Sequence, residues 1–354
     1  MPKHLHIELG SSERESIPTT NVLAYWRRLR RQLASLLAQT DTHPTTPEPC
    51  AHCGFCQFAQ LCDQQWRAAD SLVYAAGVRA TDRAVLQADG IDTLAALAAL
   101  DRDVPELDAA RAERMVRQAA LQVEARNAGD HLPPPFEVLD LPARVVAVDG
   151  DLVADASELE PVGFAALPAP DDGDIVLDYE GHPFWRPDVG LFFLFGFIER
   201  RNGEWVFKAF WAHDQAEEAQ ATEDLVDYLA ERRRRFPNMH VYHYNHTERS
   251  SLQRLAADYA VAELVLEQLV VSGLFVDLYP IVTGAIQAGV ESYGLKHIEQ
   301  LTAYKRSHDI DRGAGAVVEY EHWMSDRDQA RLDRIARYNE DDVRATLAVR
   351  DWLV

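Results

Sequence analysis

The sequence contains no long hydrophobic run and no apolar segment near its start. The longest apolar stretch covers residues 191–198, far fewer than the roughly 20 residues that a membrane-spanning helix needs. The opening residues, MPKHLHIELGSSERE, lack the apolar core of a signal peptide. We therefore expect an intracellular, cytoplasmic protein that has no contact with a membrane.

Positive charge is also scarce. The 354 residues include 57 Asp and Glu against 35 Lys and Arg, which gives a net charge of −22. This balance argues against a protein that coats nucleic acid through a generally basic surface. It leaves room for an enzyme that meets nucleic acid through metal ions and a local basic strip, for which the arginines of residues 27–31 and 232–235 are candidates. Each cluster is equally well interpreted as a solvated helix surface.

Cysteine is absent except from one short segment, PCAHCGFCQFAQLC, at residues 49–62. The spacing there is C-x2-C-x2-C-x5-C, formed by Cys50, Cys53, Cys56 and Cys62. In an intracellular protein, such clustering favours metal binding over disulfide bonds. Four thiolates suit a [4Fe–4S] cluster or a structural Zn²⁺ ion, and the tight run of the first three cysteines favours iron–sulfur.

The remaining patterns divide the chain into four parts. Residues 1–65 combine a short alternating strand, an Arg- and Leu-rich helix and the cysteines, and residues 66–128 are Ala- and Leu-rich with helical spacing. Residues 129–173 form a Pro- and Asp-rich linker with a weak hairpin around Asp149–Asp151. Residues 174–354 contain four strand-like runs, a helix at about 216–235 and a final helix at about 325–352. This order predicts an α/β fold with a mixed sheet flanked by helices, preceded by a small, mainly helical, cysteine-containing region.

The first strand of this last part ends in two acids, within IVLDYEG at residues 175–181. Side chains two residues apart on a strand share a face, so Asp178 and Glu180 project side by side. Two carboxylates this close repel each other unless a proton or a cation lies between them, and Mg²⁺ accepts such oxygen ligands. A single D-x-E pair is also typical of an ordinary strand end with exposed acids.

Two further groups of polar residues lie later in the chain. On the final helix, in RYNEDDVRAT, Tyr338 and Asp342 are four residues apart and therefore share a helical face. Glu248 comes after the strand MHVYHYN at a strand-to-helix junction, where it can point back toward the sheet. Asp277 competes with Glu248 for this place, although the start of a helix is a structural alternative for it. Asp341 competes with Asp342 but lacks the spacing to Tyr338.

The order of these motifs resembles the DEDD exonucleases of the RNase H-like fold, in the variant whose last motif carries tyrosine. The blocks GDIVLDYEG, VYHYN, SYGLKHIEQL and YNEDDVRATLAVRDWL, within residues 165–354, more closely resemble the C-terminal RNase H-like domain of bacterial RecB-like nucleases. The resemblance implies a 3′→5′ exonuclease that hydrolyses single-stranded DNA or RNA with two Mg²⁺ or Mn²⁺ ions, in a process such as DNA repair. An inactive nucleic-acid-binding protein of the same ancestry is the alternative.

Carried onto this sequence, the resemblance implies a role for each acid. Asp178 would bridge two metal ions, Glu180 and Asp342 would hold one of them, and Tyr338 would position the attacking water. Glu248 would replace the family's middle acid, which is usually Asp and lies one residue further from the asparagine of the preceding strand. Lys296, in SYGLK, is a candidate contact for a substrate phosphate and equally a solvated lysine.

The cysteine segment, together with the W-R-x2-D-x-L that succeeds it, resembles the segment after the nuclease core of RecB-like proteins. That core would carry an acid, an E-x-K and a Q-x3-Y upstream, and none is present here. We therefore expect residues 1–65 to be a remnant of that nuclease domain, in a truncated or naturally shortened relative. Cys50 would then stand in place of an upstream cysteine, and apolar surface would be open near the N-terminus. Residues 72–100 resemble degenerate helix-hairpin-helix motifs, in which Arg79 stands where a second glycine is usual, or else a plain helical connector.

Overall fold

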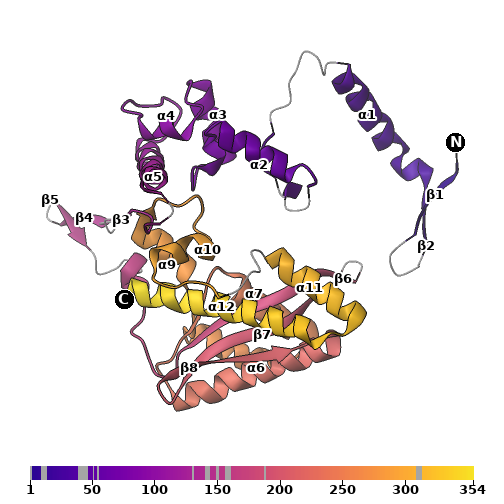
Figure 1. Ribbon diagram of the computed structural model, residues 1–354, viewed down its shortest axis with the longest axis vertical. Helices are drawn as coiled ribbons and strands as arrows, with labels where there is room; N and C mark the ends of the chain where they lie inside the picture. Colours follow the sequence, from indigo (N-terminus) through magenta and orange to yellow (C-terminus); the bar gives the residue numbers. More distant parts are fainter. Residues whose placement is uncertain are drawn as a thin grey trace. The chain divides into compact units, whose positions relative to one another are not determined.

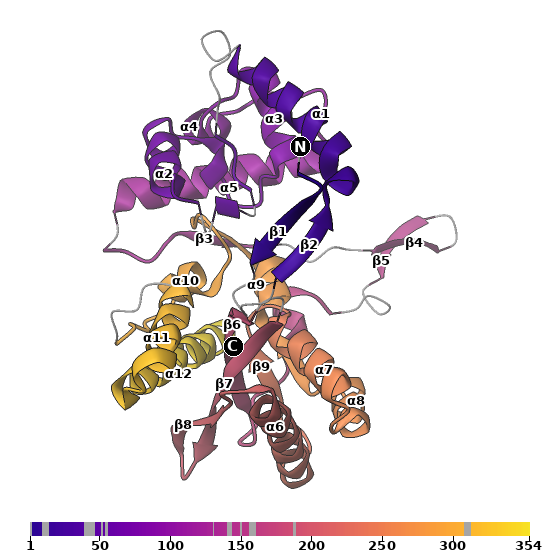
Figure 2. The same cartoon turned by 90° about the vertical axis from the view of Figure 1, so that its right-hand side faces the viewer.

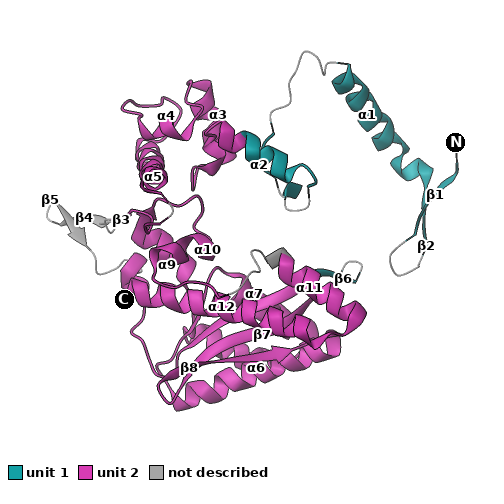
Figure 3. Cartoon of the chain, in the orientation of Figure 1, with its two compact units in different colours: residues 1–65, 183–190 teal, residues 66–182, 191–354 magenta. Residues whose placement is uncertain are grey.

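The computed structural model describes residues 2–8, 14–38, 47–50, 52–53, 56–129, 131–139, 144–148, 151–155, 161–186, 189–307 and 313–354. These residues form two compact units (Figure 3). The smaller unit contains Met1–Gln65 and Pro183–Gly190, and the larger contains Trp66–His182 and Leu191–Val354. Among the described residues, no helix is both long and apolar enough to cross a membrane.

The smaller unit begins with a β-hairpin and a long helix. Strand β1 (His4–Glu8) pairs antiparallel with β2 (Arg14–Pro18), and helix α1 (Thr19–Leu37) starts directly after it. None of the residues of α1 is buried. The cysteine segment comes next, and α2 (Ala59–Ala68) runs across the boundary into the larger unit.

The helical part of the larger unit has its own small core. Its elements are the 3-10 turn η2 (Leu72–Tyr74), α3 (Ala80–Ala88), α4 (Leu94–Ala98) and α5 (Ala109–Ala128). Side-chain oxygens cap two of these helices, since Thr93 accepts a hydrogen bond from the backbone of Ala96 at 3.0 Å and Asp108 from that of Arg111 at 3.0 Å. The buried residues of these helices pack around Leu72, Leu86 and Leu97.

The α/β part is built on a five-stranded mixed sheet in the order β10-β9-β6-β7-β8. Strand β9 runs parallel to both of its neighbours, β6 and β10, whereas β7 and β8 pair antiparallel. The strands of this sheet are β6 (Ile175–Arg186), β7 (Val189–Arg201), β8 (Glu204–Trp211), β9 (Val241–His243) and β10 (Phe275–Asp277). The predicted α/β class with a mixed sheet is confirmed.

Helices cover both faces of this sheet, as Figures 1 and 2 show. One face packs against α6, α7 and α8, and the other against α9 and α12. The helices of this part are α6 (Gln215–Arg235), α7 (Thr247–Tyr259), α8 (Glu263–Val271), α9 (Leu278–Ala285), α10 (Leu295–Ile298), α11 (Gly313–Asp326) and α12 (Gln329–Leu353). Ile175, Leu177 and Tyr179 point to the α6 side. Strand alternation therefore places Asp178 and Glu180 on the α12 side.

Several short elements complete the larger unit. Strand β3 (Phe136–Val138) pairs with β11 (Ile286–Ala288), and two 3-10 turns, η3 (Gly163–Ala166) and η4 (Glu299–Leu301), lie near α9 and α10. Strands β4 (Arg144–Val148) and β5 (Asp151–Asp155) pair as the hairpin expected around Asp149–Asp151. Residues 149 and 150 of that turn lie outside the described residues.

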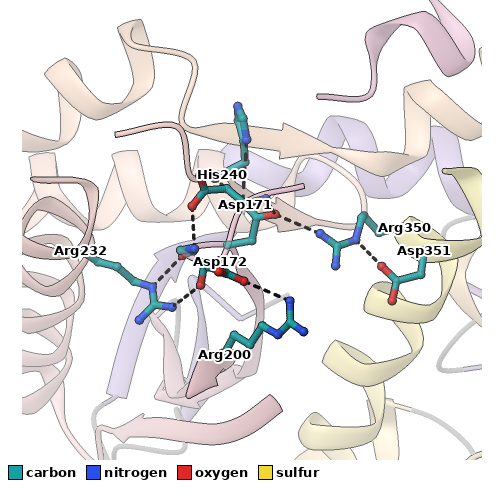
Figure 4. Close-up of polar contacts among 9 residues, drawn as sticks. Asp171, Asp172, Arg200, Arg232, His240, Arg350 and Asp351 are labelled. Atoms are coloured by element: carbon teal, nitrogen blue, oxygen red, sulfur yellow. Dashed lines mark hydrogen bonds and ion pairs between the residues drawn. The ribbon is translucent and has the colours of Figure 1, made fainter. Parts of the chain in front are cut away.

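A buried ion pair joins the last helix to the start of β6. Arg350 of α12 donates through Nη1 to Asp174 Oδ2 at 3.1 Å, and both side chains are at most 5% exposed. Asp174 also accepts hydrogen bonds from the backbone of Asp171 at 2.9 Å and of His240 at 2.8 Å. Figure 4 shows Arg350 between Asp351 and the turn that contains Asp171 and Asp172. Both oxygens of the Asp174 carboxylate are therefore engaged.

This ion pair fixes the position of Asp342 along the sheet relative to Asp178. Asp178 is four strand residues beyond Asp174, a rise of about 13 Å. Asp342 is eight helical residues before Arg350, a rise of about 12 Å. The two distances match, so pairing Arg350 with Asp174 brings Asp342 level with Asp178.

Replacing Arg350 with methionine should lower the free energy of unfolding by about 3–5 kcal/mol, because Asp174 would remain buried without its cation. Arg200 supplies a matched control, since it pairs with Asp172 at the surface, where the two side chains are 48% and 78% exposed. Arg200→Met should cost less than about 1 kcal/mol. Urea denaturation monitored by circular dichroism measures both changes, and equal losses would contradict the assigned role of Arg350.

Candidate active site

Two remote parts of the sequence bring three carboxylates together: Asp178 and Glu180 come from β6, and Asp342 comes from α12. Asp178 and Glu180 lie in the first half of β6, which continues to Arg186, so the strand does not end at them as the sequence had suggested. One oxygen from each of Asp178, Glu180 and Asp342 lies within 4.8 Å of the others. Glu180 is 8% exposed and Asp342 is 9% exposed, so water screens the group poorly. Strand alternation predicted that Asp178 and Glu180 would lie side by side, and the family resemblance implied that Asp342 would join them; the structure brings these three acids together.

Tyr338 lies one helical turn before Asp342, on the face that α12 turns toward the sheet. Its side chain is only 5% exposed, and the Lys296 ammonium lies 5.2 Å from the centre of its ring. Burial, together with the nearby Asp342, Glu180 and Asp178 carboxylates, raises the pKa of the Tyr338 hydroxyl. Tyr338 therefore keeps its proton at neutral pH and is available as a hydrogen-bond donor.

Asn339, which the sequence interpretation did not single out, ties the acids to α12. Its Nδ2 atom donates to Asp178 Oδ2 at 2.8 Å, and the residue is fully buried. Room for its amide comes from Gly196 of β7, where an added Cβ would lie 1.7 Å from Asn339 Oδ1. A glycine inside the apolar run LFFLFGFIE was the sequence signal for such a close approach.

The carboxylates hold protons more tightly than isolated acids do. Burial, together with repulsion from Asp342, Glu180 and Glu248, raises the pKa of Asp178 well above its usual range. Burial and repulsion from Asp342 raise the pKa of Glu180 in the same way, although hydrogen bonding to Asn339 opposes the change. Such a group of partly desolvated acids is stabilised by a cation, and this is the electrostatic condition for a divalent metal site.

Glu248 lies near the three acids but does not belong to the group that converges. Its charge contributes to the raised pKa of Asp178, yet it is not among the acids that converge within 4.8 Å. The side chain is buried at the start of α7, with Oε2 3.5 Å from Nδ1 of His243. Oε2 makes no hydrogen bond to the described residues. A buried carboxylate oxygen without a hydrogen bond is consistent with a ligand that remains to be bound.

The two acids that competed for these places have structural contacts. Asp277 Oδ1 caps α9 by accepting a hydrogen bond from the backbone of Tyr279 at 2.9 Å, and it accepts another from that of Asn245 at 2.8 Å. Asp341 accepts hydrogen bonds from the Tyr304 hydroxyl at 2.5 Å and the Ser307 backbone at 2.9 Å. Both contacts hold loops in place, which leaves Glu248 and Asp342 as the better candidates for the site.

Two cations approach the acids from α10 and the segment after it. Arg306 Nη1 lies 2.6 Å from Asp342 Oδ1, and its other nitrogens donate to both oxygens of Glu299 at 2.7 Å. Burial opposes the charge of Arg306, but the contacts with Glu299 and Asp342 outweigh it and raise the pKa of the guanidinium. The charge of Lys296 favours the ionised forms of Glu180 and Asp342. Arg306 thus partly neutralises the site, and no sequence motif had indicated it.

The donor set fits hard divalent cations. Asp178, Glu180 and Asp342 offer carboxylate oxygens within the range that a shared ion requires, and Mg²⁺ and Mn²⁺ prefer such ligands. Glu248 adds a further carboxylate oxygen nearby. The site can therefore hold metal through this chain's own residues.

The cysteines fit a metal only in part. Cys50 Sγ and Cys53 Sγ lie 3.9 Å apart, and turns join the two residues and also Cys53 to Cys56 through backbone hydrogen bonds of 3.0 and 3.3 Å. Among the described residues, the four thiols do not form a group of three or more at ligand spacing. Cys50 is exposed, and the other three are half-buried.

The second arginine cluster is largely structural. Arg232 is buried, pairs with Glu199 and donates to the backbone oxygen of Gly173 at 2.7 Å. Arg233 donates to the backbone oxygen of Met239. Arg234 pairs at the surface with Glu231 at 2.8 Å. The helix-surface interpretation thus fits Arg234, whereas Arg232 belongs to the protein interior.

Comparison with known proteins agrees with the fold. A family model of the RNase H superfamily matches residues 175–354, slightly more than half of the chain. The chain therefore belongs to the RNase H superfamily. The matched segment contains the whole five-stranded sheet, Asp178, Glu180, Glu248, Tyr338 and Asp342. No curated protein and no solved structure matches the sequence significantly.

Removing one charge from the acid group should stabilise the metal-free protein. In EDTA, Asp178→Asn should raise the free energy of unfolding by about 1 kcal/mol, because it relieves repulsion in a buried site. The gain should be larger at neutral pH than near pH 4. The raised folded-state pKa of Asp178 makes its ionisation cost the folded protein more free energy as the pH rises above the usual carboxyl range. Urea denaturation at both pH values measures the difference.

The exposed Asp333, on the same helix as Asp342, provides the control for this experiment. Asp333→Asn should leave stability unchanged at both pH values. Added Mn²⁺ should raise the melting temperature of the wild type but not of Asp178→Asn, because binding to the folded state stabilises it. A destabilised Asp178→Asn variant, or one that still responds fully to Mn²⁺, would contradict the metal-site interpretation.

Proposed function

We propose that the protein is a metal-dependent nuclease that hydrolyses phosphodiester bonds in single-stranded DNA or RNA, as a 3′→5′ exonuclease of the DEDD type with tyrosine. The observation that carries this proposal is the convergence of Asp178, Glu180 and Asp342 within 4.8 Å. Membership of the RNase H superfamily supports the nuclease class. The tyrosine variant is supported by the buried Tyr338 beside these acids.

Each residue has a role that its position suggests. Asp178, with Glu180 and Asp342, would hold one divalent ion, and Asp178 with Glu248 would hold a second. Two bound ions supply a nucleophilic water at neutral pH and stabilise the charge on the leaving 3′-oxygen. The protonated Tyr338 hydroxyl would orient the water, and Lys296 would offset phosphate charge, since phosphoryl transfer depends mainly on positioning and electrostatics.

A second candidate function is an inactive nucleic-acid-binding protein of nuclease ancestry. Its support is the ion pair between Arg306 and Asp342, which already neutralises one of the proposed ligands. The separation of Glu248 from the other acids also favours it. Under this proposal the acids are retained for structure, and no divalent metal is needed.

The N-terminal residues extend the proposal. The cysteine segment supports a RecB-like origin for this region, and the proposed catalysis belongs to residues 174–354. Cys50, Cys53, Cys56 and Cys62 would hold a [4Fe–4S] cluster, with Zn²⁺ as the alternative. The helices of residues 66–128 and the linker of residues 129–173 would connect this region to the exonuclease domain.

The nuclease proposal predicts Mn²⁺- or Mg²⁺-dependent shortening of a single-stranded oligonucleotide. Asp342→Asn should reduce the rate at least about 100-fold, because even residues that only orient metal ligands contribute about 10–100-fold. Tyr338→Phe should lower kcat more than it raises KM, since the hydroxyl acts on the water rather than on the substrate. Gel electrophoresis of oligonucleotides labelled at the 5′ end measures the rate and the ladder of products.

Asp333→Asn is again the matched control and should retain full activity. A blocked 3′ end should prevent shortening if the polarity is as proposed. Degradation that survives in Asp342→Asn would assign the activity to a contaminant. A complete lack of degradation with either metal, together with retained binding, would favour the inactive alternative.

The cysteine proposal predicts a brown protein with broad visible absorbance after anaerobic purification. Cys53→Ser should bleach this absorbance, because Cys53 lies in the middle of the turns that join Cys50 and Cys56. Iron and sulfide analysis provides the quantitative check. Stoichiometric zinc in a colourless protein would overturn the iron–sulfur assignment in favour of a structural zinc site.

A further inference from the structure

A cleft of about 950 Å³ lies within the larger unit, between the helical part and the α/β part. One wall comes from α2, η2 and α5, and the other from residues 289–291 and 297–305. The acids of the candidate active site do not line it. It is therefore a separate cavity whose purpose the metal site does not explain.

The two walls of this cleft are fixed to each other by close contacts. Gln118 of α5 donates to the backbone oxygen of Ala288 at 2.7 Å and accepts from the Tyr293 hydroxyl at 2.9 Å. The backbone of Gly289 lies so close to α5 that an added Cβ would be 2.5 Å from the Leu121 oxygen. The cleft is thus built into the packing of the unit.

The charge of the lining favours an anion. The acidic residues of the lining are Asp70 and Glu291, and each already has an arginine partner. Arg126 pairs with Asp70 at 2.6 Å, and Arg67 makes two hydrogen bonds of 3.0 and 3.1 Å to Glu291. The additional cationic or ionisable groups of the lining are His131, His297 and the exposed Lys305. With Arg67, Arg126 and Lys305 against Asp70 and Glu291, the formal charge of the lining is +1, whereas the whole chain carries −22.

The lining also offers a flat stacking surface. The Arg67 guanidinium lies 4.3 Å from the centre of the Tyr74 ring, and both residues line the cleft. Planar arginine and tyrosine side chains are the groups on which unpaired bases stack. Cationic side chains together with a stacking surface are typical of single-strand binding, whereas a simple anion needs only the cationic side chains.

One short segment separates this cleft from the acids. Lys296 and Arg306 face the active site, where they contact Tyr338 and Asp342. Their neighbours His297 and Lys305 line the cleft. Residues 296–306 therefore form a thin wall with the metal site on one side and the cleft on the other.

We infer that this cleft binds the backbone of single-stranded nucleic acid beside the active site. The inference rests on the proposed nuclease function and adds the surface that holds the strand. The cleft volume of about 950 Å³ falls within the range of about 300–1,000 Å³ for ligand pockets and gives room for a few nucleotides of a single strand.

Binding without chemistry tests this inference. Fluorescence anisotropy in EDTA measures the Kd of the full-length protein for a labelled oligonucleotide of about 12 nucleotides. Lys305→Glu should raise Kd about tenfold, because it replaces a phosphate contact with repulsion. Lys305→Ala should lower the slope of log K against log salt by about 0.7, the value for one phosphate contact with a single strand.

Arg234→Glu is the matched control, because it makes the same change of charge on the exposed surface of α6, far along the chain from the cleft residues. It should leave Kd unchanged. An unaltered Kd and salt slope in the Lys305 variants would overturn the inference, and so would an equal loss in Arg234→Glu. Circular dichroism spectra confirm that each variant is folded.

A separate assay distinguishes failure of the cleft from failure of the nuclease proposal. Hydrolysis of bis(p-nitrophenyl) phosphate with Mn²⁺ reports on the acids with a substrate too small to need the cleft. Absent hydrolysis with Lys305-dependent binding would refute the nuclease proposal and support the cleft. Hydrolysis that requires Asp342, combined with Lys305-independent binding, would refute the cleft alone.

Discussion

Repulsion among three carboxylates is the constraint on which this structure depends. Asp178, Glu180 and Asp342 are held within 4.8 Å of one another at a poorly hydrated place beside β6. The packing of α12 on the sheet must withstand this repulsion. The buried ion pair between Arg350 and Asp174 holds α12 against the sheet at a distance from the acids. Burying like charges is unfavourable, so a cluster of this kind marks a candidate functional site.

The environment of the acids offsets the repulsion only partly. Asn339 donates to Asp178, and Arg306 neutralises Asp342 while also holding Glu299. These contacts act mainly on Asp178 and Asp342, and Glu248 Oε2 still has no hydrogen-bond partner among the described residues. The segment that leads to Arg306 also forms the wall of the positively lined cleft. Charge at the acids and charge in the cleft are thus connected through one short stretch of backbone.

Local periodicity was enough to predict part of the site. Alternation on a strand placed Asp178 beside Glu180, and helical spacing placed Tyr338 on the face of Asp342. The α/β class came from the order of the strands and helices, although the expected final helix at 325–352 is divided into the end of α11 and the separate α12. Such local patterns could not predict contacts between residues far apart in the sequence, because these contacts depend on which helices and strands become neighbours. Arg306, the Asn339–Gly196 approach and the Arg350–Asp174 pair are of this kind, and so is Arg232, whose partner lies on another element.

The absence of a side chain at Gly196 has a consequence for how this protein can vary. A methyl group there would occupy the space of the Asn339 amide, at 1.7 Å from its oxygen. Gly196 therefore cannot gain a side chain by itself without displacing Asn339, the hydrogen-bond donor to Asp178. Relatives with alanine or a larger residue at position 196 would need a residue smaller than asparagine at position 339. The two positions should therefore covary.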